Sequence, residues 1–205
     1  MFLINNMGFR KQIIFLLIIT LTFACNKKVD YYNIPVKSLD NNFNAVIEIP
    51  AGTNKKFEYN KESQTFEIDK KERQERVINF LPYPGNYGFL PSTYSDPKKG
   101  GDGDALDVLV LSESVATGTV LEISPIALLK LIDNGEVDYK VIAIPSDVKH
   151  QIIKVNNYND FSNRFPEIKQ IIELWFLNYN KADIAVVEGW EDEKMAIIEI
   201  NKNKL

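Results

Sequence analysis

Three aspartates stand close together in the segment Gly-Gly-Asp-Gly-Asp-Ala-Leu-Asp-Val, residues 100–108. Carboxylates at this spacing repel one another and raise each other's pKa values unless a cation neutralises them. Oxygen ligands suit a hard ion such as Mg²⁺ or Ca²⁺, and the glycines permit turns that let Asp102, Asp104 and Asp107 converge. The segment therefore indicates a divalent metal cluster, with an acidic surface turn as the alternative.

Four further segments concentrate polar side chains between short apolar runs. Each segment alone is also typical of a solvated turn or strand edge, and only their combination points to function. Alternate residues of a strand point to the same face, so Lys56 and Glu58 are expected to share one. The candidates are Glu48 within Val-Ile-Glu-Ile-Pro, Lys56 and Glu58, the turn residues Tyr83 and Tyr87, and Asp133, Glu136, Asp138 and Lys140 around a second acidic turn.

The elements that must position these residues are mostly short strands. Many short β-type runs separated by turn residues favour an antiparallel barrel or sandwich. One clear helix is expected from Pro166 to about Tyr179, with an apolar stripe that packs on the barrel except at Tyr179, and a weaker helix at about 192–201. The predicted strands are 46–49, 56–59, 65–68, 77–80, 108–111, 120–123, 126–132 and 141–144.

The N-terminus has the pattern of a secretory signal. Arg10 and Lys11 precede the apolar run 13–19, which is short for a membrane span. Cys25, the only cysteine, follows Ala24 directly and resembles the lipidated cysteine of bacterial lipoproteins, although Phe23 departs from the usual residue. Plain secretion and a retained N-terminal anchor are the alternatives, and Met7 is a second possible initiator.

This pattern predicts three parts: a signal peptide at 1–24, a lipidated Cys25 with a polar tether at 25–43, and one domain at 44–205. The expected location is outside the cytoplasm, on a bacterial membrane. Removing the signal peptide takes the formal net charge from −4 to −6, which argues against non-specific nucleic-acid binding. One histidine, His150, and one cysteine cannot build a common zinc site, and no disulfide is possible.

The ordered motifs resemble the soluble family I inorganic pyrophosphatases. The run 102–108, the tyrosine turn and the second acidic turn together are highly specific, and the resemblance extends over roughly residues 44–200. The matching segments are Val-Ile-Glu-Ile-Pro (46–50), Lys-x-Glu (56–58), Pro-Gly-Asn-Tyr-Gly-Phe (84–89), Asp-Gly-Asp-Ala-Leu-Asp-Val (102–108), Asp-x-Gly-Glu-x-Asp-x-Lys (133–140), Tyr179 and Val-Glu-Gly-Trp (187–190).

The resemblance implies an α+β, mainly β fold: an OB-like, five-stranded closed barrel with additional strands and two flanking helices. It also implies hydrolysis of pyrophosphate to two phosphates by a metal-activated water attacking in line, with several Mg²⁺ ions as cofactors. By position, Asp104 would accept the proton of that water, and Tyr83 would line the same pocket. The metal ligands would be Asp102, Asp107, Asp133 and Asp138, with Glu48 and Glu58 acting through water, and the phosphate ligands would be Lys56, Arg76, Tyr87, Lys140 and Tyr179.

Four positions depart from the family pattern. Ala105 replaces the proline of the signature Asp-x-Asp-Pro-x-Asp, and the family arginine corresponds to Arg76 or, with irregular spacing, to Arg73. Asn134 stands where many members carry a second acid. Asn180 follows Tyr179 where a lysine is common, and Lys181 is the residue that could replace it.

Two other functions remain open at this point. A non-catalytic lipoprotein that binds a divalent metal or phosphate is one, and its nearest motif is a calcium loop from Asp102 to Glu113. That loop fails at Leu106 and at Asp107, where a glycine is required. A hydrolase of other polyphosphates is the second. The expected partners are pyrophosphate and, through the anchor, a membrane; a homo-oligomer is expected, with its size open.

Overall fold

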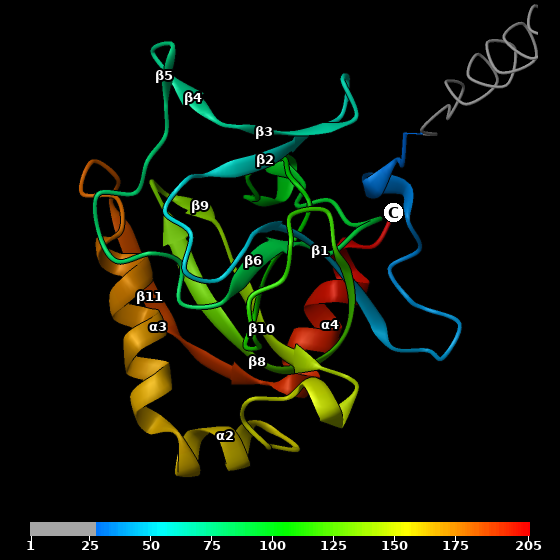
Figure 1. The fold of residues 1–205 in the computed structure, drawn as a ribbon. Coiled ribbons are helices and arrows are strands. Elements are labelled where there is room, and N and C mark those ends of the chain that lie inside the picture. The colour runs from blue at the N-terminus through cyan, green and yellow to red at the C-terminus, as the bar shows by residue number, and fades with distance from the viewer. Residues whose placement is uncertain (1–27) are drawn as a thin grey trace, which may run out of the picture.

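A seven-stranded sheet forms the centre of the computed structural model, which describes residues 28–205 (Figure 1). Its pairings run in a ring, from β1 to β6, β7, β10 and β8 and back to β1; β7 and β10 are parallel and the other pairs antiparallel. The strands are β1 (Phe43–Ile49), β6 (Asn86–Phe89), β7 (Asp107–Val110), β8 (Val120–Asp133), β9 (Glu136–Val137), β10 (Lys140–Pro145) and β11 (Ala185–Asp192).

The expected mainly β, α+β class is confirmed, whereas the closed, OB-like barrel stays a prediction beyond this ring of pairings. The prediction of two helices was wrong, because the described residues contain three α-helices: α2 (Tyr158–Arg164), α3 (Pro166–Asn178) and α4 (Glu193–Asn203). Helix α2 buries only Phe161 and is otherwise polar, so it has no apolar period to reveal it. The side chain of Asn157 caps its first turn by accepting from the backbone N–H of Asp160 at 2.9 Å.

Helices α3 and α4 cover opposite faces of the central strands. Successive residues of a strand point to opposite faces, and the core divides in this way. Leu109 and Ile142 pack in one apolar cluster with α3, and their neighbours Val108 and Val141 pack in another with α4. This double coverage explains why β10 is buried along its whole length.

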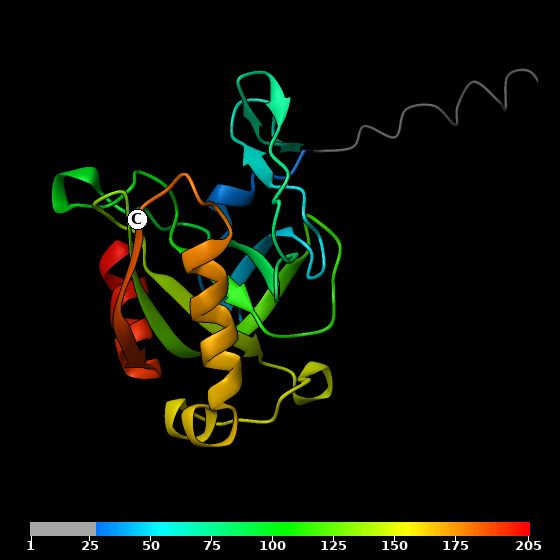
Figure 2. The same cartoon turned by 90° about the vertical axis from the view of Figure 1, so that its left-hand side faces the viewer.

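Two small hairpins rise at the end of the molecule opposite α2, as Figure 1 and Figure 2 show. Their strands are β2 (Phe57–Asn60), β3 (Thr65–Ile68), β4 (Lys70–Lys71) and β5 (Gln74–Glu75), and each hairpin is a two-stranded sheet of its own. The predicted strand at 77–80 was wrong. Val77 makes a single bridge to Lys55, and Val77 and Phe80 are exposed, so this run lacks a partner strand despite its apolar residues.

The N-terminal residues that the structure describes pack against the domain. Tyr31–Asn33 forms the short 3₁₀ helix η1, Val36 is buried, and β1 begins at Phe43. The segment expected to be a tether is therefore packed from Tyr31 onward. The predicted signal peptide and Cys25 lie outside the described residues. Between residues 28 and 205, no helix has the length and apolar character needed to cross a membrane.

Candidate active site

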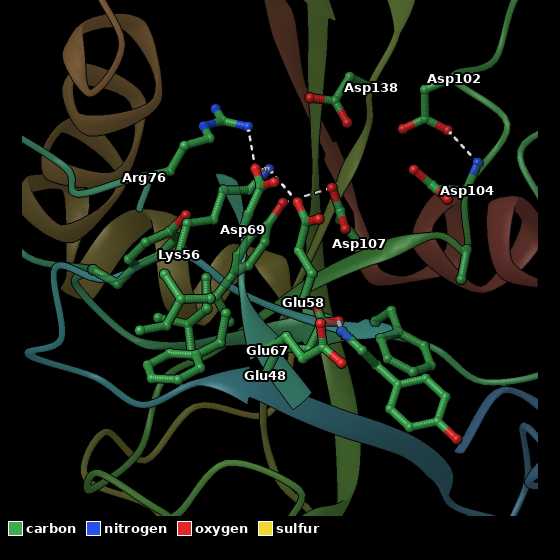
Figure 3. Close-up of a pocket in the computed structure, with 18 of the residues that line it drawn as sticks. Glu48, Lys56, Glu58, Glu67, Asp69, Arg76, Asp102, Asp104, Asp107 and Asp138 are labelled. Atoms are coloured by element: carbon green, nitrogen blue, oxygen red, sulfur yellow. Dashed lines mark hydrogen bonds and ion pairs between the residues drawn. The ribbon is translucent and has the colours of Figure 1, made fainter. Parts of the chain in front are cut away.

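One open cavity of about 1180 Å³ lies between the hairpins and the central sheet (Figure 3). All of the residues that the sequence predicts for catalysis, substrate binding and metal binding line it. They come from β1, the β2–β3 hairpin, the tyrosine turn, both acidic turns and the end of α3. These residues are Glu48, Lys56, Glu58, Arg76, Tyr83, Tyr87, Asp102, Asp104, Asp107, Asp133, Asp138, Lys140 and Tyr179.

The first acidic turn bends at two glycines with positive φ, Gly100 at 89° and Gly103 at 87°, a conformation that other residues adopt at a cost. Within it, Asp102 accepts a hydrogen bond from the backbone N–H of Asp104 at 3.0 Å. Burial raises the pKa of the Asp102 carboxyl. Figure 3 shows Asp102, Asp104 and Asp107 around one side of the cavity.

The second acidic turn is joined to the first through both backbone and side chains. Val137 donates its backbone N–H to the carbonyl of Gly100 at 2.8 Å. The ammonium of Lys140, buried at 3% exposure, donates to Asp107 and to Asp138. Burial opposes the charge of Lys140, but the two carboxylates outweigh it and raise the pKa of the ammonium. Lys140 therefore holds the two turns together as a cation.

Two other carboxylates, Glu48 and Asp133, line the cavity with raised pKa values. Glu48 is 8% exposed, and burial raises its pKa to about 8 although the backbone N–H of Tyr59 donates to it at 2.7 Å. Burial also raises the pKa of Asp133, and its Oδ1 atom is buried without a hydrogen-bond partner among the described residues. Such an unpaired buried oxygen is costly unless a further donor or cation supplies its partner.

The β2–β3 hairpin and the segment after it supply the cations of the opposite wall. Lys56 contacts Glu58 at 2.6 Å, which agrees with the shared face expected for these residues. Asp69 lies between two cations, 2.8 Å from Arg76 and 3.9 Å from Lys56 (Figure 3). Sequence reasoning missed Asp69, which follows a strand within a run of mixed charges. Its position as the first polar residue after β3 is the only local signal.

Three tyrosines form the aromatic wall of the cavity. The hydroxyl of Tyr87 donates to Asp107 at 2.5 Å. Burial raises the pKa values of Tyr83 and Tyr87, and it raises the pKa of Tyr179 to about 12. All three hydroxyls therefore stay protonated at neutral pH and can donate hydrogen bonds.

Trp175 orders this aromatic wall and was read from the sequence only as core packing. Its ring stacks on Tyr179, with centroids 4.7 Å apart and planes at 8°, and lies 4.5 Å from the ring of Tyr83. Its indole N–H donates to the carbonyl of Leu81 at 2.8 Å. An aromatic residue one helical turn before Tyr179 was the available signal, since residues at i and i+4 are neighbours on a helix.

Some of the residues at the positions that depart from the family pattern line the cavity and others do not. Arg76 lines the cavity and Arg73 does not, since Arg73 lies at φ 69° in the β4–β5 turn. Asn134 lines the cavity and accepts from the backbone N–H of Ile184 at 3.1 Å. Asn180 donates to Asp183, and Lys181 does not line the cavity.

The arrangement pairs a carboxylate-rich wall with a cationic and phenolic one. Among residues 28–205 no three acidic, histidine or cysteine side chains converge closely enough to form a ready-made metal site. The donor set is nevertheless all oxygen, it includes the Oδ1 atom of Asp133, which has no hydrogen-bond partner among the described residues, and burial raises the pKa of Glu48. Such a cavity is suited to a highly charged anion bound together with hard cations.

Comparisons with known proteins agree with this geometry. Residues 45–204 match the family model of inorganic pyrophosphatases. An inorganic pyrophosphatase of Neisseria meningitidis serogroup B is 38% identical over 157 residues, which cover 75% of this chain and 81% of that protein. One from Synechocystis is 32% identical over 170 residues, covering 80% and 90%. The crystal structure of the inorganic pyrophosphatase from Thermus thermophilus superposes with a TM-score of 0.73 at 29% identity, covering 85% and 97%.

Proposed function

This chain belongs to the inorganic pyrophosphatase family and hydrolyses inorganic pyrophosphate to two phosphates, and we propose that the cavity of Figure 3 is its active site. The observation that carries the proposal is the convergence of thirteen separately predicted residues on one cavity. They come from segments up to 131 residues apart, Glu48 to Tyr179, and no single motif would bring them together.

The proposed cofactor is Mg²⁺, in several ions. The ligands are Asp102, Asp107, Asp133 and Asp138, with Glu48 and Glu58 acting through water. Oxygen-only donors and an unpaired buried carboxylate oxygen on Asp133 support a hard divalent ion. When bound, such ions neutralise phosphate charge, lower the pKa of water and orient the attack.

The protein's own residues divide the remaining work. Water attacks one phosphorus, the bridging P–O bond breaks, and Asp104 accepts the proton of the water. Lys56, Arg76 and Lys140 bind phosphate oxygens and offset the negative charge that grows on the leaving phosphate. The neutral hydroxyls of Tyr83, Tyr87 and Tyr179 donate hydrogen bonds and fix the orientation of the substrate.

Phosphate release from pyrophosphate by the purified protein with Mg²⁺ tests the activity, and triphosphates and nucleotide triphosphates test the substrate range. Asp104→Asn is expected to lower kcat by ~100-fold or more, because the general base is lost. Asp147→Asn makes the same chemical change outside the cavity and should keep full activity. An Asp104→Asn enzyme as active as the Asp147→Asn control would contradict the assignment of Asp104 as the general base.

We also propose that Cys25 carries a lipid and holds the enzyme outside the cytoplasm. The leader pattern and the position of Cys25 directly after Ala24 support this. Cells fed a labelled lipid precursor should label the wild-type protein and not Cys25→Ala. Equal labelling of both proteins would contradict the anchor.

A homo-oligomer remains our expectation, and sedimentation of the purified protein measures its size.

A further inference from the structure

The segment Lys28–Ile34, here called the N-terminal strap, runs along the β2–β3 hairpin. Lys28 donates from its ammonium to the carbonyl of Ser63 at 2.7 Å, in the turn of the hairpin. On β2, the hydroxyl of Tyr59 donates to the carbonyl of Val29 at 2.8 Å. The strap thus contacts both the turn and a strand of the hairpin.

Two tyrosines of the strap insert between the hairpin and the body of the domain. The ring of Tyr31 meets Tyr59 edge-on at 5.2 Å and Phe66 at 4.9 Å. The ring of Tyr32 stacks on Phe89 of β6, with centroids 4.5 Å apart and planes at 17°. Aromatic pairs in these geometries stabilise packing beyond the effect of their buried area.

The strap is fixed to the body on its other side. The backbone N–H of Ser92 donates to the carbonyl of Tyr32 at 2.8 Å, and its hydroxyl donates to the carbonyl of Ile34, also at 2.8 Å. The ammonium of Lys61, in the hairpin turn, lies 4.0 Å from the ring centroid of Tyr32. Tyr32 therefore joins the main sheet to the hairpin.

The hairpin is not part of the seven-stranded sheet, so contacts such as these, together with the hydrogen bond from the backbone N–H of Tyr59 to Glu48, hold it to the body. It is a two-stranded sheet of four-residue strands, and isolated hairpins of this kind are marginally stable in water. Yet it carries Glu58, and Lys56 directly precedes it, so its position sets one wall of the cavity.

We propose that Tyr31 and Tyr32 are positioning residues that hold the β2–β3 hairpin, with Lys56 and Glu58, over the carboxylates of the active site. The inference rests on the proposed roles of Lys56 and Glu58. Tyr32 itself lines the cavity, and burial together with the carboxylate of Glu48 raises its pKa, so its hydroxyl stays neutral. The segment between the proposed anchor and the domain is thereby part of the active-site architecture.

Kinetics of Tyr32→Ala and Tyr32→Phe test the proposal. Tyr32→Ala should raise KM for pyrophosphate by about tenfold, because a displaced Lys56 no longer meets the substrate, and should change kcat less. Tyr32→Phe keeps the stacked ring and should restore KM to near the wild-type value. In a Lys56→Ala background Tyr32→Ala should add little, since the group that it positions is already absent.

The matched control is Val36→Ala, which truncates a buried side chain of the same N-terminal stretch in a different apolar cluster. It should lower stability without raising KM. Hydrogen exchange of the β2 and β3 amides should accelerate in Tyr32→Ala and not in Val36→Ala.

If Lys56→Ala raises KM, wild-type KM in Tyr32→Ala, or additive effects of Tyr32→Ala and Lys56→Ala, would overturn the positioning role. Hydrogen exchange of the β2 and β3 amides tests the positioning role of Tyr32 even if Lys56 does not bind the substrate. If Lys56→Ala alone leaves KM unchanged, the substrate role of Lys56 fails. Unchanged exchange in Tyr32→Ala then shows that the strap also fails, and faster exchange confined to the hairpin retains it.

Discussion

Lys140 is the residue at which the two acidic turns of the active site meet. Its ammonium donates to Asp107 and Asp138, so one buried positive charge faces two carboxylates. Breaking a buried ion pair leaves an uncompensated charge and costs about 3–5 kcal/mol. Neutralising both carboxylates takes a further cation, which is the role proposed for Mg²⁺. Lys140 thus holds two carboxylates in place that can bind a cation, and its own positive charge favours a bound anion.

Glu48 allows a pH-dependent test of the same electrostatics. Its pKa is about 8 in the folded chain against an ordinary 4.5, so the folded state holds a proton that the unfolded state has lost between these values. Stability without metal should therefore fall as pH rises from about 4.5 to 8 and stay low above that. Glu48→Gln keeps the acceptor for Tyr59 and removes this loss of stability, which amounts to ~5 kcal/mol or less at pH 9.

Urea unfolding of wild type and Glu48→Gln, in chelator at pH 5 and pH 9, measures this effect. The free energy of unfolding of Glu48→Gln should exceed that of the wild type at pH 9, and the difference should be much smaller at pH 5. Adding Mg²⁺ at high pH should narrow the gap, because a bound cation offsets the charge of Glu48. A stability difference independent of pH would show that Glu48 carries no such penalty.

Trp175 should control substrate affinity through the tyrosine that it stacks on. Trp175→Leu removes the flat contact with Tyr179 and the hydrogen bond to Leu81, so the phenol loses its fixed orientation. We expect KM for pyrophosphate to rise by about fivefold or more, a cost of ~1 kcal/mol in orientation. Trp190→Leu changes the other tryptophan, which lies outside the cavity, and should leave KM unchanged. Equal KM values in the two variants would contradict the role.

At the scale of residues, the types of the carboxylates, lysines and tyrosines indicated candidates, and the family resemblance of their order along the chain predicted which of them line the cavity. The sequence could not predict the groups that orient them. Asp69 lies between Lys56 and Arg76 only because β3 pairs with β2, and Trp175 meets Tyr83 only because α3 packs on the tyrosine turn. Such contacts depend on tertiary packing, which leaves no mark on local spacing.

At the scale of elements, Asn86 fixes the start of β6 within the core. Its fully buried amide accepts from the backbone N–H groups of Ala51 and Val115, each at 3.0 Å, and donates to Ser112 and to the carbonyl of Glu113. All four of its hydrogen-bonding positions are used. This single side chain ties together the turn after β1, the strand β6 and the loop after β7.

Asn86→Ala should accordingly destabilise the fold by ~3 kcal/mol, because two buried N–H groups lose their acceptor. Thermal or urea unfolding measures this loss. Asn42→Ala removes an exposed amide that makes one hydrogen bond, to Glu122 at 2.8 Å, and should cost less than ~0.5 kcal/mol. If Asn86→Ala lowers the free energy of unfolding by no more than this control, the turn after β1 and the loop after β7 keep their stability without the Asn86 side chain.

Two errors in the predicted strands, at β6 and at residues 77–80, have opposite physical causes. Strand β6 was read as a turn because it follows Pro84-Gly85, yet Gly88 lies so close to the carbonyl of Val46 that no side chain fits there. That glycine marks the close approach of the paired strands β1 and β6 rather than a bend. The run 77–80 shows the converse error, since apolar residues without a neighbouring strand form no sheet. Strand β10 and the periodic α3 were predicted because their burial is repeated along the sequence, whereas the two strands predicted at 120–123 and 126–132 are one continuous strand, β8.

At the scale of the whole molecule, the two walls of the active site belong to different parts. One is the seven-stranded sheet, and the other is formed by the two hairpins and the residues next to them, which are not paired with that sheet. The sheet carries the acidic turns, whereas Glu58 lies on β2, Lys56 directly precedes β2 and Arg76 directly follows β5. Without a cation, repulsion among the carboxylates of the cavity opposes the compact state. Ligands that bind only the folded state raise its stability by mass action. Divalent ions should therefore stabilise this protein, by an amount that rises with the logarithm of their concentration relative to Kd.

Mg²⁺ and Ca²⁺ should separate this stabilisation from catalysis. Both ions prefer oxygen ligands, so both should raise the unfolding temperature in a concentration-dependent way that Asp138→Asn weakens. Only Mg²⁺ should support hydrolysis, because it demands near-octahedral geometry at about 2.0–2.1 Å, whereas Ca²⁺ accepts six to eight ligands at longer distances and aligns the reacting groups poorly. Added Ca²⁺ should inhibit the Mg²⁺-dependent reaction competitively with Mg²⁺. Turnover with Ca²⁺ alone would show that the cavity does not require the tighter geometry, and an unfolding temperature insensitive to both ions would show that its carboxylates hold neither.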